Sequence, residues 1–322
     1  MKGKHTVIVR NARVQFTLEL ERNITVIRGD SATGKTTLIG MLQDYEAQGR
    51  SSGVNLSCDK RCCVLSGIEW EDRLSRLHDC IVFLDEGNPF VSSQAFAQAI
   101  MGTSNYYVLI TRESLYQLPY SVDAVLELRK TTSRHKCTYN RTYPYYGQLP
   151  NTITKLQSVD TILTEDSNSG HQMFAHIAQE RGKGCLSAGG KSNIHRYLEE
   201  LKSQRTLVIA DGAAFGAEME KIYQYLLLHE DKVTLYLPES FEWIILKSGI
   251  IAADDLEDIL TDPSEYIDSE EYFSWEQYFT ALLIALTSQQ ESYKHYSKRT
   301  LSAFYLQQAN VQKILAAMDS EQ

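Results

Sequence analysis

The stretch that decides the fold of the first half of this chain is ITVIRGDSATGKTTLIG, residues 24–40. Its apolar and β-branched start predicts a buried strand, and an apolar helix follows the turn bracketed by Gly29 and Gly34. Backbone amides in such a turn bind anions, and the positive end of the helix dipole faces the same point. Lys35 and Thr36 come directly after the second glycine. The spacing G-x-x-x-x-G-K-T therefore predicts a phosphate-binding loop, and the alternative is a chance Gly-Lys-Thr turn before a helix.

The loop resembles the Walker A motif of P-loop NTPases, which bind ATP or a related nucleoside triphosphate together with Mg²⁺. The resemblance implies that Lys35 reaches the β- and γ-phosphates and serves catalysis, and that the Thr36 hydroxyl ligates Mg²⁺. The residues expected to contact the nucleotide from this motif are Gly29, Asp30, Ser31, Ala32, Thr33, Gly34, Lys35, Thr36 and Thr37.

A second motif, IVFLDE at residues 81–86, predicts a buried strand that ends in two carboxylates. Asp85 is the expected Mg²⁺ partner, and Glu86 is placed to orient or deprotonate an attacking water. The alternative is a core strand that ends in a solvated acidic pair.

Residues 1–130 resemble the ATP-binding-cassette class in the order of their elements, most clearly in LDEGNPFVSSQAFAQAIMGTSNYYVLITRES after the phosphate loop. Two features of that class are missing. Only 48 residues separate Thr36 from Asp85, too few for the helical subdomain with its LSGGQ signature, and Leu65-Ser66-Gly67 is interpreted as a strand end. Arg112 replaces the switch histidine and is either a phosphate contact or a surface arginine. We therefore expect nucleotide binding with slow hydrolysis.

The alternation of strands and helices predicts an α/β fold, a P-loop sheet followed by a second α/β domain and C-terminal helices. AVLELRK, residues 124–130, is interpreted as an edge strand, and the polar stretch 131–152 as a hairpin or linker. The expected divisions are an ATP-binding domain (1–140), a linker (141–155), a second α/β domain (156–250) and an acidic segment with helices (251–322).

Glu165 and Asp211 each follow a predicted strand of the second half. Carboxylates at neighbouring strand ends can share a divalent cation at the carboxyl edge of the sheet. Residues 158–250 loosely resemble the Toprim domain of topoisomerases, primases and OLD-type nucleases, in which a glutamate and an Asp-x-Asp pair hold the metal. Ala213 stands at the second aspartate, and Glu218 or Glu242 are candidates to replace it. The readings that stay open are a non-cleaving Toprim-like module, an active nuclease, and an α/β domain with merely acidic strand ends.

Composition and charge bear on where the protein is located and on whether it binds nucleic acid. No apolar run approaches the ~20 residues of a membrane span, no secretory signal is visible, and the six cysteines do not suggest a disulfide framework, so we expect a cytoplasmic protein. Residues 1–150 carry 18 Lys and Arg against 15 Asp and Glu, whereas residues 151–322 carry 14 against 26. The acidic second half argues against non-specific binding of nucleic acid by that half, although a local binding site is compatible with it.

These observations favour an ATP-binding, slowly hydrolysing switch whose second domain recognises nucleic acid or a protein partner. The two resemblances together imply a role in phage defence or mobile-element biology, and they are compatible with an oligomer. An ATP-gated, metal-dependent nuclease is the first alternative. A non-enzymatic nucleotide-binding interaction protein is the second.

Overall fold

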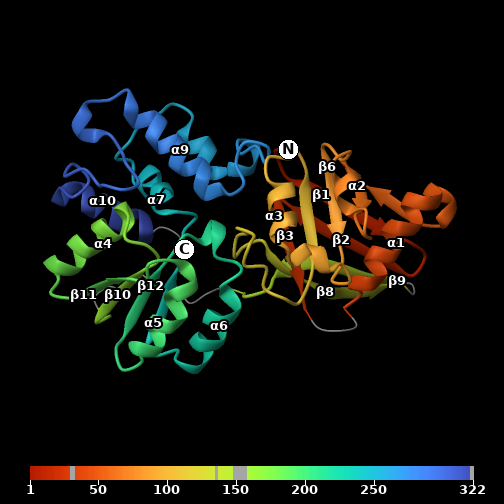
Figure 1. Ribbon diagram of the computed structural model, residues 1–322, viewed down its shortest axis with the longest axis horizontal. Helices are drawn as coiled ribbons and strands as arrows, with labels where there is room; N and C mark the ends of the chain where they lie inside the picture. The colour runs from red at the N-terminus through yellow and green to blue at the C-terminus, as the bar shows by residue number, and fades with distance from the viewer. Residues whose placement is uncertain (30–32, 135–136, 148–157, 320–322) are drawn as a thin grey trace. The chain divides into compact units, whose positions relative to one another are not determined.

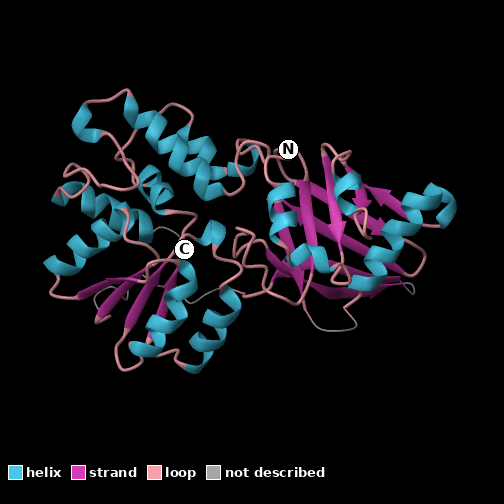
Figure 2. Cartoon of the chain, in the orientation of Figure 1, coloured by secondary structure: helices cyan, strands magenta, loops and turns pink. Residues whose placement is uncertain are grey.

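The computed structural model describes residues 1–29, 33–134, 137–147 and 158–319 (Figure 1). The chain forms two compact units. Unit 1 comprises Met1–Gly147 and Asp262–Ser274, and unit 2 comprises Gln148–Thr261 and Trp275–Gln322. Each unit combines a sheet with helices, so the α/β prediction is confirmed (Figure 2). The units divide at Gly147, within the stretch expected to be a linker, and Asp262–Ser274 returns to unit 1 from the expected C-terminal region.

Unit 1 is built on a nine-stranded mixed sheet in the order β4-β1-β2-β9-β8-β3-β7-β6-β5. Strands β3, β7 and β6 are buried along their whole length, as expected for parallel strands whose two faces are covered. The strands are β1 His5–Arg10, β2 Val14–Leu20, β3 Ile24–Arg28, β4 Asn55–Ser57, β5 Arg61–Val64, β6 Cys80–Leu84, β7 Tyr106–Ile110, β8 Val125–Arg134 and β9 Cys137–Pro144.

The described helices of unit 1 are short except for the one that follows β3. That helix, α1, packs against β5, β1 and β4, and its buried side chains join the core formed by the sheet. The helices of this unit are α1 Lys35–Gln48, α2 Trp70–Leu74 and α3 Gln94–Ile100, with 3-10 turns η1 Gly49–Ser52, η2 Pro89–Ser92 and η6 Pro263–Glu265.

Strand β8 is not the edge strand that the sequence predicted. It lies between β3, its parallel neighbour, and β9, with which it forms an antiparallel hairpin. Strand β9 in turn pairs in parallel with β2. The polar stretch 131–152 was expected to be a hairpin or a linker, and its first part forms the hairpin. Strand β9, CTYNRTYP, is polar, yet its backbone groups complete the ladders of two neighbours, which places β8 inside the sheet.

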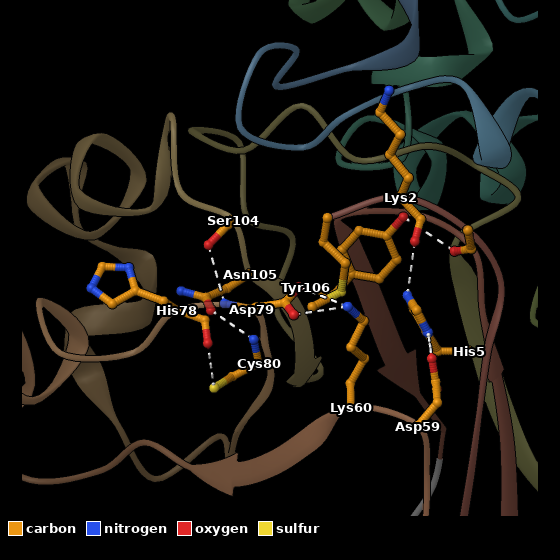
Figure 3. A network of polar contacts seen from close by, with 12 residues as sticks. Lys2, His5, Asp59, Lys60, His78, Asp79, Cys80, Ser104, Asn105 and Tyr106 are labelled. Atoms are coloured by element: carbon orange, nitrogen blue, oxygen red, sulfur yellow. Dashed lines mark hydrogen bonds and ion pairs between the residues drawn. The ribbon is translucent and has the colours of Figure 1, made fainter.

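Polar contacts link the amino ends of neighbouring strands in this sheet (Figure 3). The His5 ring nitrogen lies 2.8 Å from a carboxylate oxygen of Asp59, and Asp59 lies in the turn between β4 and β5. Lys60 pairs with Asp79 at 2.8 Å, just before β5 and β6 begin. The amide of Cys80 donates to the Asn105 side chain at 3.0 Å, which links the starts of β6 and β7. These contacts hold neighbouring strands in register independently of the candidate site.

Unit 2 contains a four-stranded, wholly parallel sheet in the order β11-β10-β12-β13. Helix α4 packs on β10 and β11, α5 packs against α6, and α7 contacts both α9 and α10. The strands are β10 Thr161–Thr164, β11 Gly184–Ser187, β12 Thr206–Ile209 and β13 Val233–Tyr236. The helices are α4 Ser169–Glu180, α5 Ile194–Glu200, α6 Met219–Leu228, α7 Phe241–Lys247, α8 Leu256–Thr261, α9 Trp275–Ser288 and α10 Gln308–Asp319, with 3-10 turns η4 Lys191–Asn193, η5 Gly212–Ala214 and η7 Ser292–Lys294.

Candidate functional sites

The sheet order of unit 1 brings the predicted site residues to one edge. Strand β7 lies between β3 and β6, and the registers Ile27–Ile110 and Leu84–Leu109 place the three carboxyl ends level with one another. The residues that follow these ends include Gly29, Arg112 and Asp85. Ligands of open α/β sheets bind at this edge, and the glycine-bracketed turn after β3 and the acidic pair Asp85 and Glu86 after β6 both begin there.

The Lys35 side chain is folded back onto the loop that precedes it. Its ammonium donates to the backbone oxygen of Gly29 at 2.6 Å and to the Thr33 hydroxyl at 3.1 Å. The side chain is buried, with only 7% of the residue exposed. A buried ammonium needs such partners, because desolvating it without them is costly. The two contacts join the start of α1 to Gly29 and Thr33, the described residues on either side of the loop.

Gly34 has the backbone geometry that the turn into α1 requires. Its φ is +91°, in the left-handed region, and it occupies the N-cap position of α1. A Cβ at this position would lie 3.0 Å from a ring carbon of Phe16 in β2. Glycine suits this position for two reasons: the backbone is left-handed, and a side chain would crowd Phe16. Thr36 and Thr37 follow in the exposed first turn of α1, and the predicted contacts Asp30, Ser31 and Ala32 lie outside the described residues.

Asp85 and Glu86 form the turn that leaves β6. An Asp85 carboxylate oxygen accepts the Glu86 amide at 2.9 Å, and the Asn88 side chain donates to the Asp85 carbonyl at 3.1 Å. Both acidic residues line a cavity of about 430 Å³, together with Arg112 and residues of η2. Glu86 is exposed, whereas Asp85 is half-buried.

Arg112 lies on the same cavity and is paired with Glu86. Its Nε is 3.6 Å from a Glu86 oxygen, and the two side chains are 55% and 46% exposed. An exposed pair of this kind contributes at most about 1 kcal/mol, so an incoming phosphate can compete for the guanidinium. The structure thus places Arg112 beside the acidic pair rather than on a remote surface.

Arg28 is a residue that the sequence reasoning missed. It ends β3, one position before Gly29, and is buried. Its guanidinium donates to the Ser114 hydroxyl at 2.9 Å and to the Tyr146 hydroxyl at 3.3 Å. Arg28 therefore links the end of β3 to Ser114, in the segment after Arg112, and to Tyr146, which follows β9. A single arginine at the end of an apolar strand offers no signal of this in the sequence.

Leu65-Ser66-Gly67 continues from the end of β5. Leu65 is fully buried, and its amide donates to the Phe83 carbonyl of β6 at 2.9 Å. The Gly67 amide donates to the Asn88 side chain at 3.3 Å. These contacts place the tripeptide at a strand end, as interpreted from the sequence.

In unit 2 the structure brings Glu165 and Asp211 together. Glu165 follows β10 and Asp211 follows β12, and these two strands are parallel neighbours. The Asp211 amide donates to a Glu165 carboxyl oxygen at 3.2 Å, and an Asp211 oxygen accepts the Phe241 amide of α7 at 3.1 Å. Gly212 beside them leaves no room for a side chain, since a Cβ would lie 2.4 Å from the Leu237 carbonyl oxygen.

Burial shifts both carboxyls toward their protonated forms. Desolvation raises the pKa of Glu165 to about 7, with the nearby Glu276 adding to the effect. Desolvation, followed by the charges of Glu276 and Glu165, raises the pKa of Asp211 well above its ordinary value. Buried carboxylates near one another cannot all ionise without a compensating cation.

A small cavity of about 40 Å³ lies at this edge of the unit 2 sheet. Besides Glu165 and Asp211 it is lined by Glu242 and Lys298. The Lys298 ammonium pairs with Glu276 at 2.5 Å. Burial acts to lower the pKa of Lys298, but the charges of Glu276 and Glu242 together outweigh it, and the net shift of the pKa is upward. Lys298 and Glu276 were not anticipated from the sequence, because they come from the C-terminal segment, more than 60 residues beyond Asp211.

Within the described ranges, no group of three or more His, Cys, Asp or Glu side chains could hold a metal ion. In the same part of the chain, no helix is long and apolar enough to cross a membrane. The sequence matches no protein-family profile and no curated protein.

Proposed function

We propose that unit 1 binds ATP, or a related nucleoside triphosphate, together with Mg²⁺, and that it hydrolyses the nucleotide slowly as a switch. The observation that carries the proposal is the Lys35 ammonium, held at 2.6 Å from the Gly29 carbonyl at the start of α1. A lysine held inside a glycine-bracketed turn at a helix N-terminus suits a bound phosphate chain.

The groups around the loop suit a magnesium nucleotide. Thr36 offers a hydroxyl in the first turn of α1, and Asp85 offers a carboxylate at the same sheet edge. Mg²⁺ prefers hard oxygen ligands of these kinds and keeps several waters, and when bound it would neutralise part of the phosphate charge. Glu86 would orient the attacking water, and Arg112 would contact the terminal phosphate.

The test is the replacement of Lys35. Lys35→Ala should weaken ATP binding by on the order of tenfold to a hundredfold, because the loop loses a charge-assisted contact to the phosphates. Isothermal titration calorimetry with a non-hydrolysable ATP analogue and Mg²⁺ measures the change. Lys60→Ala removes a lysine paired with Asp79 at the opposite edge of the sheet and should leave affinity unchanged. Equal affinity for Lys35→Ala and the parent would remove the basis for the assignment.

The switch function assigns unit 2 to recognition of nucleic acid or a protein partner, within phage defence or mobile-element biology. The acidic cavity of unit 2 favours a second candidate, ATP-gated and metal-dependent cleavage of phosphodiesters, because two carboxyls already meet at its sheet edge. Incubation of the chain with single- and double-stranded DNA and RNA, with Mn²⁺ and with or without ATP, tests it. Cleavage by the parent that disappears in Glu165→Gln would favour the nuclease, and no cleavage would favour the switch.

A further inference from the structure

Two half-buried cysteines flank the turn between β4 and β5. Cys58 directly follows β4, and Cys62 is the second residue of β5, with the bend at Asp59 and Lys60 between them. Both sulfurs contact the backbone of Lys60. Its amide donates to the Cys58 sulfur at 3.4 Å, and the Cys62 thiol donates to its carbonyl at 3.8 Å. The two thiols also lie within hydrogen-bonding reach of one another. The turn therefore gathers two sulfurs around one residue.

We propose that Cys58 and Cys62 form a hydroperoxide-reactive thiol pair, which oxidation closes into a disulfide across this turn. Cys58 is the sulfur that reacts with the oxidant, and Cys62 is the sulfur that resolves the product. The oxidant is a hydroperoxide such as hydrogen peroxide, and a small dithiol reverses the reaction by thiol–disulfide exchange. The proposal concerns the turn between β4 and β5 and does not depend on nucleotide binding.

The surroundings of the two sulfurs assign the order of reaction. The hydrogen bond from Cys62 has the largest effect on the pKa of Cys58 and lowers it. The Lys60 amide acts in the same direction, burial and Asp59 oppose both, and the net shift is downward. The hydrogen bond to Cys58, followed by burial, raises the pKa of Cys62. Because the thiolate is the nucleophile in thiol chemistry, Cys58 reacts first and Cys62 keeps its proton until the second step.

The oxidation is balanced over two steps. In the first, the Cys58 thiolate attacks a peroxide oxygen, an S–O bond forms, the O–O bond breaks, and the leaving hydroxide takes up a proton to become water. Cys58 is then a sulfenic acid. In the second step, the Cys62 sulfur attacks the Cys58 sulfur, the S–S bond forms, the S–O bond breaks, and hydroxide leaves with the Cys62 proton as water. The two sulfurs together lose the electron pair that reduces the peroxide.

The fold anchors the turn that carries the pair (Figure 3). Asp59 contacts the His5 ring of β1 at 2.8 Å, and Lys60 pairs with Asp79, just before β6, at 2.8 Å. The side chains of both cysteines pack against the core that the sheet shares with α1. These contacts hold the backbone between the cysteines, so the sulfurs stay near one another in the reduced chain. Disulfide formation requires such proximity.

The other four cysteines have different surroundings. Cys63 and Cys80 are buried, and burial raises the pKa of Cys63 to about 12 and also raises that of Cys80. Burial raises the pKa of Cys185 to about 11. Cys137 is half-buried in β9, far along the sheet from β4 and β5 in the strand order. Buried thiols of high pKa react slowly, so Cys58 is expected to be oxidised before them.

The experiment treats the reduced full chain with hydrogen peroxide at neutral pH and counts thiols after denaturation. The count should fall by two from the six of the reduced chain, and tandem mass spectrometry of its peptides should identify a Cys58–Cys62 disulfide that dithiothreitol removes. Cys58→Ser should slow thiol loss by about tenfold or more, because the sulfur that reacts first is gone. Cys137→Ser is the matched control, a half-buried cysteine of the same unit, and should stay within about twofold of the parental rate.

Cys62→Ser separates the two roles. Without the resolving sulfur, oxidation should stop at the Cys58 sulfenic acid, which dimedone traps as a covalent adduct on that residue. Labelling of another cysteine instead would contradict the assigned order.

Three further results would overturn the proposal: a thiol count in the parent that peroxide leaves unchanged, parental reaction rates in Cys58→Ser, or a disulfide that joins other cysteines or two chains. Melting of the reduced variants checks folding. The thiol count and the disulfide map come from the parent, so they decide the outcome even where a serine variant fails to fold.

Discussion

At the scale of single residues, Glu86 is exposed, whereas the preceding Asp85 is half-buried. Both line the cavity at the carboxyl ends of β6 and β7. Asp85 is half-buried and accepts the amide that follows it, which fixes the turn. Glu86 makes an exposed pair with Arg112 on the wall of the same cavity. A residue held so weakly by the fold contributes little to stability. Its expected contribution is therefore to the orientation of water rather than to folding.

Glu86→Gln should stop hydrolysis while ATP still binds, because the amide keeps the shape of the side chain but does not act as a base. Phosphate release under saturating ATP measures the first effect, and calorimetry measures the second. Glu113→Gln is the matched control, since Glu113 is an exposed glutamate on the same cavity. Hydrolysis by Glu86→Gln at the parental rate would assign the water-orienting role to another group.

At the scale of elements, Gly34 and Lys35 define how α1 begins. Gly34 combines a left-handed backbone with close approach to Phe16. The Lys35 ammonium donates to the Gly29 carbonyl just after the end of β3. Gly40, in the same helix, has ordinary backbone geometry and no atom within 4 Å of the position of a Cβ. Replacement by alanine of Gly34, which precedes α1, and of Gly40, within α1, should therefore change the free energy of unfolding in opposite directions.

Gly34→Ala should lower the free energy of unfolding by about 1 to 3 kcal/mol, because alanine is strained at this φ and its Cβ crowds the Phe16 ring. Gly40→Ala should raise it by about 0.5 to 1 kcal/mol, since it removes flexibility from the unfolded chain at a compatible helical position. Urea denaturation monitored by tryptophan fluorescence compares both with the parent. Equal stability of the two variants would mean that the turn adjusts without cost.

At the scale of the whole molecule, a buried acidic cluster makes stability depend on pH. Burial raises the pKa of Glu165 to about 7 from an ordinary value of 4.5. Between these values the folded chain binds more protons at this site than the unfolded chain does. The contribution is therefore complete below pH 4.5 and is lost as the pH rises through about 7. The raised pKa of Asp211, caused by burial and by the charges of Glu276 and Glu165, acts in the same direction.

Glu165→Gln should recover about 1 to 3 kcal/mol of unfolding free energy relative to the parent at about pH 8, and little at about pH 4. The glutamine can still accept the Asp211 amide but carries no charge to bury. Urea denaturation in metal-free buffer at both pH values measures the difference. Glu230→Gln changes an exposed glutamate of the same unit and should show no such pH dependence. A constant difference between Glu165→Gln and the parent across the range would contradict the shift.

The sequence by itself determined the features that depend on a few consecutive residues. Residues 24–40 predicted β3, the glycine turn and α1, and the apolar runs predicted β6 and β7 with the residues that follow them. The ends of β10 and β12 predicted that Glu165 and Asp211 would lie at neighbouring positions. Motif spacing and hydrophobic periodicity are properties of a few consecutive residues, so they can be read without knowing the partners.

Only the tertiary structure decided which distant segments complete these elements. The interior place of β8 depends on β9, and the return of residues 262–274 to unit 1 includes a hydrogen bond from the Asn23 side chain to the Phe273 carbonyl at 2.8 Å. Glu242 lines the same cavity as Asp211 because α7 begins beside Asp211, whereas Glu218 lies at the N-cap of α6. Polar strands and buried charges are stabilised by partners far along the chain, and local sequence carries no record of that pairing.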